Sequence, residues 1–134
     1  MTSKSILALV ISGSGTLQNG LLALMTTIPQ INAVLVAEDV NSALKMVENH
    51  HPGLIILDMS IPDMQDVIKQ IKEQCPHGHL IVLVEDTIEE KEVEESGADS
   101  VLLKGFSAQK LIAIVENLID RQGALPQVQP NPEG

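Results

Sequence analysis

Five short apolar runs divide the chain. They occupy residues 5–11, 32–37, 54–57, 80–84 and 101–103. A short apolar run without polar alternation is typical of a strand that is buried on both faces, as in a parallel sheet. The run at 54–57 leads directly into Asp58 and is bounded by Gly53 and Pro62. We therefore predict five buried strands, the third of which ends at Asp58.

Between these runs, apolar residues recur at every third or fourth position, which is the spacing of a helix with one buried face. Thr16 is expected to cap a first helix that ends before Pro29. Asn41 is expected to cap the second helix and Ser107 the last one. Strands that alternate with helices in this way predict an α/β fold with a parallel sheet covered on both sides.

Composition bounds the kind of protein. The chain has 134 residues, a net charge of −10, one Phe and neither Trp nor Tyr, so one domain with an aliphatic core is expected. The negative charge argues against direct binding to nucleic acid or to an anionic membrane, because phosphate contacts need clustered Lys and Arg. The single Cys75 cannot form an intrachain disulfide, and no apolar run reaches the length of a membrane span. A cytoplasmic location is therefore expected.

The C-terminal residues differ from the rest of the chain. From residue 122 onward the sequence is rich in proline and has no periodicity. We predict a folded domain over residues 1–121 and an extended tail or linker over residues 122–134. Such a linker suggests an output domain in a longer protein.

Several motifs carry a resemblance to a known family. Asp58 ends the third predicted strand with Pro62 four positions later, and the run Gly-Ala-Asp-Ser-Val-Leu-Leu-Lys at 97–104 ends the fifth strand at Lys104. With Gly20-Leu21 in the first helix, these motifs resemble the receiver domain of bacterial response regulators over residues 4–121. The resemblance implies a flavodoxin-like (βα)5 fold, doubly wound, with strand order 2-1-3-4-5.

The resemblance also implies a chemistry. Asp58 would accept a phosphoryl group from a histidine kinase, and two acids after the first strand would help it to hold Mg²⁺. A Thr or Ser at the end of the fourth strand and Lys104 would bind the phosphoryl oxygens. An aromatic residue in the fifth strand would change its rotamer when the aspartate is phosphorylated. The resemblance therefore implies a signalling module and not an enzyme.

The sequence departs from this pattern at the site. The two acid positions hold Ser12 and Gly13, and the Thr or Ser position holds Glu85. The aromatic position holds Val101. Because no charged residue occurs between residues 4 and 38, no shift of the alignment restores the acid pair.

These departures predict weak chemistry. Mg²⁺ is a hard cation that needs several oxygen ligands, and only Asp58 and the backbone of Ser60 remain, so Mg²⁺ binding is expected to be weak or absent. An anionic phosphoryl donor would be neutralised by Lys104 alone and repelled by Glu85. We expect a phosphorylation-impaired receiver that works by contacts with a histidine kinase, another signalling protein or a second copy of the chain.

Two other interpretations stay open. The first is an active phosphoaspartate receiver that regulates an output domain lost from this chain. The second is a small-anion binder that uses the glycine turn from Ser12 to Thr16. Gly15 and Gly20 in that region have the spacing of a phosphate-binding loop, but leucines stand where such a loop has Lys and Ser or Thr.

Two structural expectations follow from charge. Lys104 is expected to bridge toward Glu85 and Asp58, because a cation offsets the repulsion of two nearby carboxylates. The helix at 89–96 is expected to be the least stable element, since Ile88 and Val93 are its only large apolar anchors. Its glutamate-rich sequence predicts either a solvated face or an acidic docking surface.

Overall fold

The computed structural model describes residues 6–13, 15–58 and 64–124 of the chain. The strands in these ranges form one parallel sheet. The order of its five strands is β2-β1-β3-β4-β5, which confirms the predicted α/β flavodoxin-like topology. Each predicted apolar run corresponds to one strand. The strands are β1 (Ile6–Ser12), β2 (Ile31–Ala37), β3 (Leu54–Asp58), β4 (His79–Val84) and β5 (Ser100–Leu103).

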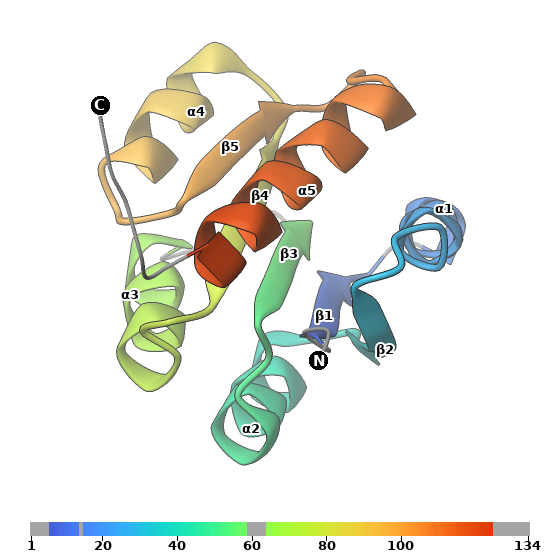
Figure 1. Cartoon of the computed structure of the whole chain (residues 1–134). Helices are drawn as coiled ribbons and strands as arrows, with labels where there is room; N and C mark the ends of the chain where they lie inside the picture. The colour runs from blue at the N-terminus through green and yellow to red at the C-terminus, as the bar shows by residue number, and fades with distance from the viewer. Residues whose placement is uncertain (1–5, 14, 59–63, 125–134) are drawn as a thin grey trace, which may run out of the picture.

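Helices cover both faces of the sheet (Figure 1). Helices α1 and α5 share one core with the strands, and helices α2, α3 and α4 share the other. The helices are α1 (Gly15–Met25), α2 (Val40–His50), α3 (Met64–Gln74), α4 (Thr87–Glu94) and α5 (Ala108–Ala124). None of these described helices combines the length and the apolar character that a membrane crossing requires.

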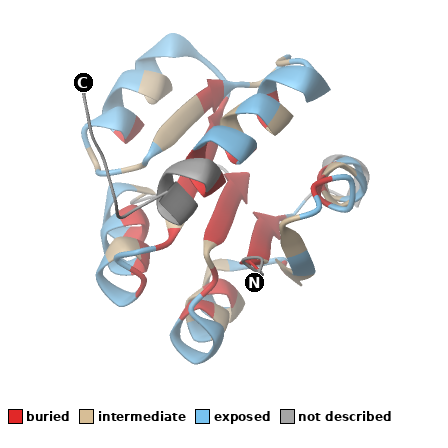
Figure 2. Cartoon of the chain, viewed as in Figure 1, coloured by how far each residue is buried: buried red, intermediate tan, exposed pale blue. Residues whose placement is uncertain are grey.

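The strand residues alternate between the two cores, as the two-residue period of a strand requires. In β3, Leu54 and Ile56 face α1 and α5, whereas Ile55 and Leu57 face α2, α3 and α4. All five β3 residues are buried, and burial is concentrated in the strands (Figure 2). Two-sided burial explains why the central strands are continuous apolar runs.

Two predicted helix starts are wrong. Helix α2 is capped by Asp39 and not by Asn41, because the Asp39 carboxylate accepts a hydrogen bond of 2.8 Å from the backbone N–H of Ser42. That backbone hydrogen bond also lowers the pKa of Asp39 below its ordinary value. Helix α1 begins at Gly15, so Thr16 lies inside it and not at its cap. The helical period does not identify the capping residue, because that residue has non-helical backbone angles and lies outside the periodic segment.

Helix α1 also ends earlier than predicted, at Met25. The hydroxyls of Thr26 and Thr27 donate to the backbone oxygens of Ala23 and Leu24, each at 2.7 Å, and these bonds satisfy the last turn of the helix. Ile28 lies beyond the helix but is still buried, so its contribution to the core does not need helical geometry.

The ends of the last two helices show one error and one confirmed cap. Ile88 of α4 is 73% exposed and does not anchor the helix, whereas Val93 is buried as predicted. Ser107 caps α5 as predicted, since its hydroxyl accepts a hydrogen bond of 3.1 Å from the backbone N–H of Lys110. Helix α5 continues to Ala124, so residues 122–124, predicted as part of the tail, are helical. Residues 125–134 of the predicted tail lie outside the described residues.

Candidate functional site

The candidate site lies at the carboxyl ends of the strands. Ser12, the last residue of β1, pairs in register with Asp58, the last residue of β3. Glu85 directly follows β4 and Lys104 directly follows β5, and the backbone N–H of Lys104 donates to the oxygen of Val84 at 2.8 Å. The carboxyl edge of an open α/β sheet is where ligands bind, so the fold gathers these four polar residues at its usual binding edge.

Asp58 is a buried carboxylate whose two oxygens are both engaged. The residue is 4% exposed. Its Oδ2 accepts a hydrogen bond of 3.1 Å from the hydroxyl of Ser12, and its Oδ1 lies 2.7 Å from the ammonium Nζ of Lys104. A buried carboxylate needs partners of this kind, because removing it from water without them is strongly unfavourable.

Lys104 joins two carboxylates. Its Nζ lies 2.7 Å from Asp58 and 2.8 Å from Oε2 of Glu85, which confirms the predicted bridge. Partial burial acts to lower the pKa of Lys104, but the hydrogen bonds and charges of Asp58 and Glu85 outweigh it and raise the pKa above its ordinary value. The lysine is therefore held as a cation between the two acids.

Glu85 is in turn held by the start of α4. Its backbone N–H donates to Oε1 of Glu89 at 2.8 Å, while the backbone N–H of Glu89 donates to Oδ1 of Asp86 at 2.8 Å. Reciprocal bonds of this kind are a variant of the capping box, in which the cap and a residue three positions later satisfy each other's backbone. The spacing Asp86-x-x-Glu89 is the sequence signal that could have revealed this arrangement. Through Glu85 and Lys104, the start of α4 is therefore connected to Asp58.

Two further contacts could not be predicted from the sequence. The hydroxyl of Ser12 was predicted only as a missing acid, yet it is a hydrogen-bond donor to Asp58. The amide Nε2 of Gln18 donates to the backbone oxygen of Ser12 at 3.0 Å and so ties α1 to the end of β1. Both contacts depend on the distance between strand ends, and no sequence spacing encodes that distance.

The other predicted site residues take no part in this cluster. Val101 is half-buried and packs against the core of α2, α3 and α4. Gly13 is exposed and offers no side-chain ligand. Ser14 and Ser60 lie outside the described residues, so the glycine turn as an anion site and the Ser60 backbone as a ligand stay predictions.

The described residues do not fit a Mg²⁺ ion. They offer it the carboxylates of Asp58 and Glu85, and both of these groups are already paired with the ammonium of Lys104. No group of three or more His, Cys, Asp or Glu in the described ranges could hold a metal. Because Mg²⁺ gives up its water reluctantly and needs anionic oxygen ligands that offset this loss, the ammonium of Lys104 is a poor neighbour for it.

The fold and its aspartate–lysine pair define a receiver-like module, which is the class that the sequence resembled. The response regulator receiver domain matches residues 9–116, and the chain therefore belongs to that family.

Two curated relatives are regulatory proteins. The nitrate/nitrite response regulator NarL of Escherichia coli K12 is 28% identical over 108 residues, which are 78% of this chain and 50% of NarL. The alkaline phosphatase synthesis transcriptional regulatory protein PhoP of Bacillus subtilis is 33% identical over 95 residues, covering 66% of this chain and 38% of PhoP. The chain thus spans half or less of the length of these relatives.

A solved structure shows the same fold. The receiver domain of the sensor histidine kinase PA1611 from Pseudomonas aeruginosa PAO1 superposes with a TM-score of 0.74 at 18% identity, covering 87% of this chain and 98% of that one. A magnesium ion is coordinated in the active site cleft of that protein.

Proposed function

We propose that this receiver domain signals through protein contacts and that phosphoryl transfer to Asp58 is impaired. The observation that carries the proposal is the pairing of both Asp58 oxygens, one with Ser12 at 3.1 Å and one with Lys104 at 2.7 Å. A carboxylate attacks phosphorus through a free oxygen lone pair aligned with the leaving group. The two contacts stabilise the negative charge on these oxygens, so they lower the nucleophilicity of Asp58.

Charge at the site supports the same proposal. A phosphoryl donor would meet the carboxylates of Asp58 and Glu85 and only one cation, Lys104. Phosphoryl transfer depends mostly on cations that stabilise the charge of the transferring group. PA1611 holds a magnesium ion at its site, whereas the positions of this chain that would supply further anionic ligands are Ser12 and Gly13. The electrostatic support for the reaction is therefore reduced.

Glu85 supplies a substitute contact in this proposal. Its carboxylate pairs with Lys104 where the resemblance implies a phosphoryl oxygen would pair. A lysine already held by an internal anion keeps one arrangement without phosphorylation. We therefore propose that the domain has one signalling conformation, which partners recognise directly.

The proposed partners are signalling proteins. They include a histidine kinase, another signalling protein, a second copy of the chain, or an output domain attached beyond the described residues. NarL and PhoP are named as a response regulator and a transcriptional regulatory protein, and each is at least twice as long as the matched region. We place the domain in the cytoplasm, where such partners act.

Acetyl phosphate labelling tests the proposal. The wild-type chain is incubated with acetyl phosphate and MgCl₂, and phosphorylation is followed by intact mass and by the loss of signal in Asp58→Asn. The comparison is the triple variant Ser12→Asp, Gly13→Asp, Glu85→Thr, which supplies the two acids and removes the contact of Lys104 with Glu85. Because each electrostatic contact is worth about 10²-fold in rate, the variant should label roughly 100-fold faster or more.

Beryllofluoride provides a second measurement that does not depend on the donor. With Mg²⁺ present, it should perturb the amide NMR signals near Asp58 in the triple variant and leave those of the wild type unchanged. Wild-type labelling at Asp58 within about tenfold of the triple variant, when circular dichroism shows both folded, would contradict impairment and favour an active phosphoacceptor.

A further inference from the structure

Strand β2 forms an open edge of the sheet. It stands at one end of the strand order, so only one of its sides is paired, with β1 (Figure 1). The backbone N–H of Ile6 donates to the oxygen of Gln30 at 2.9 Å, so Ile6 and every second residue after it in β1 face β2. In this parallel register, Val34 and Val36 direct their backbone N–H and C=O groups away from β1. Among the described residues, no other segment bonds to these outward groups.

The β2 edge lacks most of the features that protect an edge strand. Natural edge strands are usually short, charged, interrupted by proline or bulged. β2 has seven residues without a charge or a proline, and no charged residue occurs anywhere in the segment 5–37. A bulge occurs only at its start, at Asn32, and the pairing with β1 is regular from Ala33 to Ala37. This regular stretch can therefore accept a further strand.

The opposite edge of the sheet is protected. β5 has four residues, and the charged residues Asp99 and Lys104 flank it. Asp99 is held by an ion pair of 2.9 Å with Lys72, and Lys104 is held by the bridge described above. A short strand between two charges is a poor template for a further strand. The two edges therefore differ, and β2 is the one that is open to pairing.

Two hollows lie along β2 and leave room for an added strand. One, of about 440 Å³, adjoins the first half of the strand and is also lined by Met25 and Thr26. The other, of about 430 Å³, adjoins its end and is also lined by Gln18 of α1 and Met46 of α2. Val34, Leu35 and Val36 are only half-buried. Side chains of a second strand can therefore be accommodated at both ends of β2, and they would cover these apolar residues.

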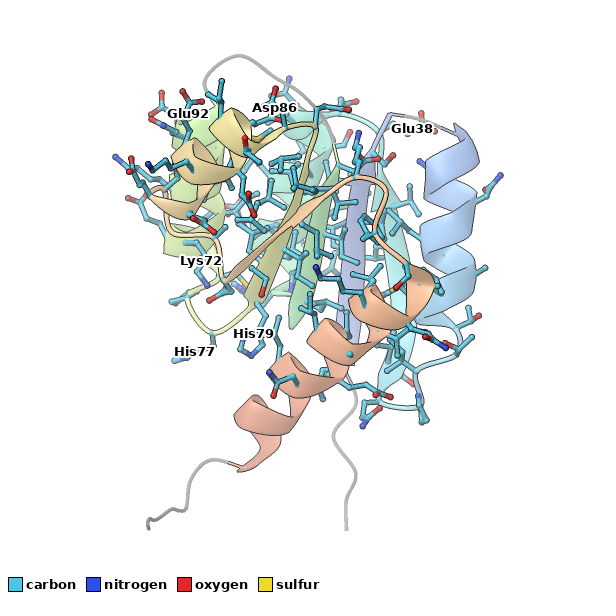
Figure 3. All side chains as sticks on the ribbon, turned by 90° about the horizontal axis from the view of Figure 1, so that it is seen from above. Glu38, Lys72, His77, His79, Asp86 and Glu92 are labelled. Carbon is cyan, nitrogen blue, oxygen red and sulfur yellow. The ribbon has the colours of Figure 1, made fainter. Side chains whose placement is uncertain are left out.

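Charge and symmetry favour a second copy of the chain as the occupant. Most approaches between two copies are repulsive because the net charge is −10, but the segment 5–37 is neutral. In an antiparallel pairing centred on Leu35, Val34 of one copy lies opposite Val36 of the other, so the outward groups of both copies satisfy each other. Glu38 lies at the same end of the sheet as Asp86 (Figure 3). The pairing sets the two Glu38 residues about 20 Å apart along the strands, beyond the Debye length of about 8 Å.

Other occupants fit this edge less well. The C-terminal residues 125–134 of the chain contain three prolines, which have no N–H to donate to a strand. A partner selected by opposite charge would find no charged residue on β2 or α1. A neutral edge that is complementary to itself remains, and this is the property of a two-fold interface.

We propose that two copies of the domain pair through β2, antiparallel about Leu35, and join their five-stranded sheets into one continuous sheet. The inference rests on the proposed function, of which it specifies one partner and the surface that this partner uses. Gln18 lines the hollow at the end of β2 and donates to the backbone oxygen of Ser12, whose hydroxyl donates to Asp58. The paired edge is therefore connected to the Asp58 cluster of each copy.

Sedimentation velocity of the full chain tests the pairing. The chain is measured from about 1 μM to about 1 mM in about 0.15 M salt, and the wild type should shift from monomer to dimer as its concentration rises. Hydrogen exchange at both ends of this range locates the contact. The amides of Val34 and Val36 should become more protected in the dimer, whereas those of β5 should not change.

Two alanines provide matched substitutions. Ala33 in β2 and Ala113 in α5 are both exposed. Ala33→Lys should raise the dimer Kd about tenfold or more, because the pairing would remove water from a lysine on each edge. The same change lowers the net negative charge, so a general charge effect would instead strengthen the dimer. Ala33→Glu should also weaken the dimer, whereas Ala113→Lys should change its Kd less than about twofold. Circular dichroism checks that each variant is folded.

Three results would overturn the inference. They are a wild type that stays monomeric at about 1 mM, a dimer whose added protection lies outside β2, or equal effects of Ala33→Lys and Ala113→Lys on the Kd. The proposed function is tested separately by acetyl phosphate. Rapid labelling of Asp58 in a chain that forms the β2 dimer would refute impaired phosphorylation and leave the pairing in place, whereas slow labelling of a monomer would do the opposite.

Discussion

Replacing Lys104 by methionine removes the cation that the buried Asp58 carboxylate needs. The Asp58 side chain is 2% exposed, whereas that of Lys104 is 31% exposed. Breaking a fully buried pair costs about 3–5 kcal/mol, and an exposed pair contributes about 0–1 kcal/mol. Water can reach the vacated lysine position, and Ser12 still donates to Oδ2. We therefore expect Lys104→Met to lower the free energy of unfolding by about 1–3 kcal/mol.

The second arm of the bridge should contribute much less. The Glu85 side chain is 59% exposed, so solvent screens its pairing with Lys104. We expect Glu85→Gln to lower the free energy of unfolding by less than about 1 kcal/mol. The double variant Asp58→Asn with Lys104→Met should lose less stability than the sum of its single variants. The coupling energy should be about 1–2 kcal/mol, because the two residues are in contact.

Urea unfolding followed by circular dichroism at pH 7 measures these differences. With a slope of about 1.5–2 kcal/mol per molar urea, Lys104→Met should lower the midpoint by roughly 1 M and Glu85→Gln by less than about 0.5 M. Equal losses in the two single variants, or no coupling between positions 58 and 104, would show that the Asp58–Lys104 contact does not stabilise the fold.

Three further predictions concern pH, the fourth helix and two glycines. The pKa of Lys104 in the folded protein is raised above 10.5, so the contribution of the charged lysine to stability is complete below pH 10.5. The difference in unfolding free energy between wild type and Lys104→Met should therefore shrink as pH rises through the higher folded pKa. Urea unfolding at a series of alkaline pH values measures this difference, and a constant difference would contradict the prediction. In hydrogen exchange, amides of α4 should exchange faster than those of β3. Asp86→Ala should speed the exchange of α4 amides about fivefold by removing the helix cap, without affecting β3. Equal protection of α4 and β3 would contradict the prediction. Gly20→Ala should raise the free energy of unfolding by about 0.5–1 kcal/mol, because Gly20 lies in a helix and an added Cβ meets no atom within 4 Å. Gly78→Ala should lower it by about 1–3 kcal/mol, because the added Cβ would lie 2.7 Å from the sulfur of Cys75. A shift of the thermal unfolding midpoint in the same direction for both variants would refute the packing argument.

The sheet and its site edge could be predicted from the sequence to a large extent. A central strand buried on both faces must be apolar at consecutive positions, so β3 is visible as a run of apolar residues that ends in Asp58. The strand order came from the resemblance, and the sheet confirms it. The bridge from Lys104 to Glu85 was also predictable. Strand ends meet at one edge, and opposite charges placed there pair.

The details that the sequence did not reveal depend on distances between segments far apart in the chain. Ser12 and Asp58 are 46 positions apart, and only the parallel register of β1 and β3 brings the hydroxyl within 3.1 Å of the carboxylate. The sequence could therefore indicate that an acid is missing at position 12. It could not indicate that a donor replaces it.

The exposure of Ile88 was decided by tertiary packing alone. A helix of eight residues with two large apolar side chains has no clear period, so either side chain could face the core. In the folded domain Val93 packs into the core that α2, α3 and α4 share, and this packing leaves Ile88 in solvent. Local sequence sets which segments become helices and strands, because propensity and periodicity act over a few residues. The face that a short helix buries depends on its contacts with distant strands, which form only when the whole sheet is assembled.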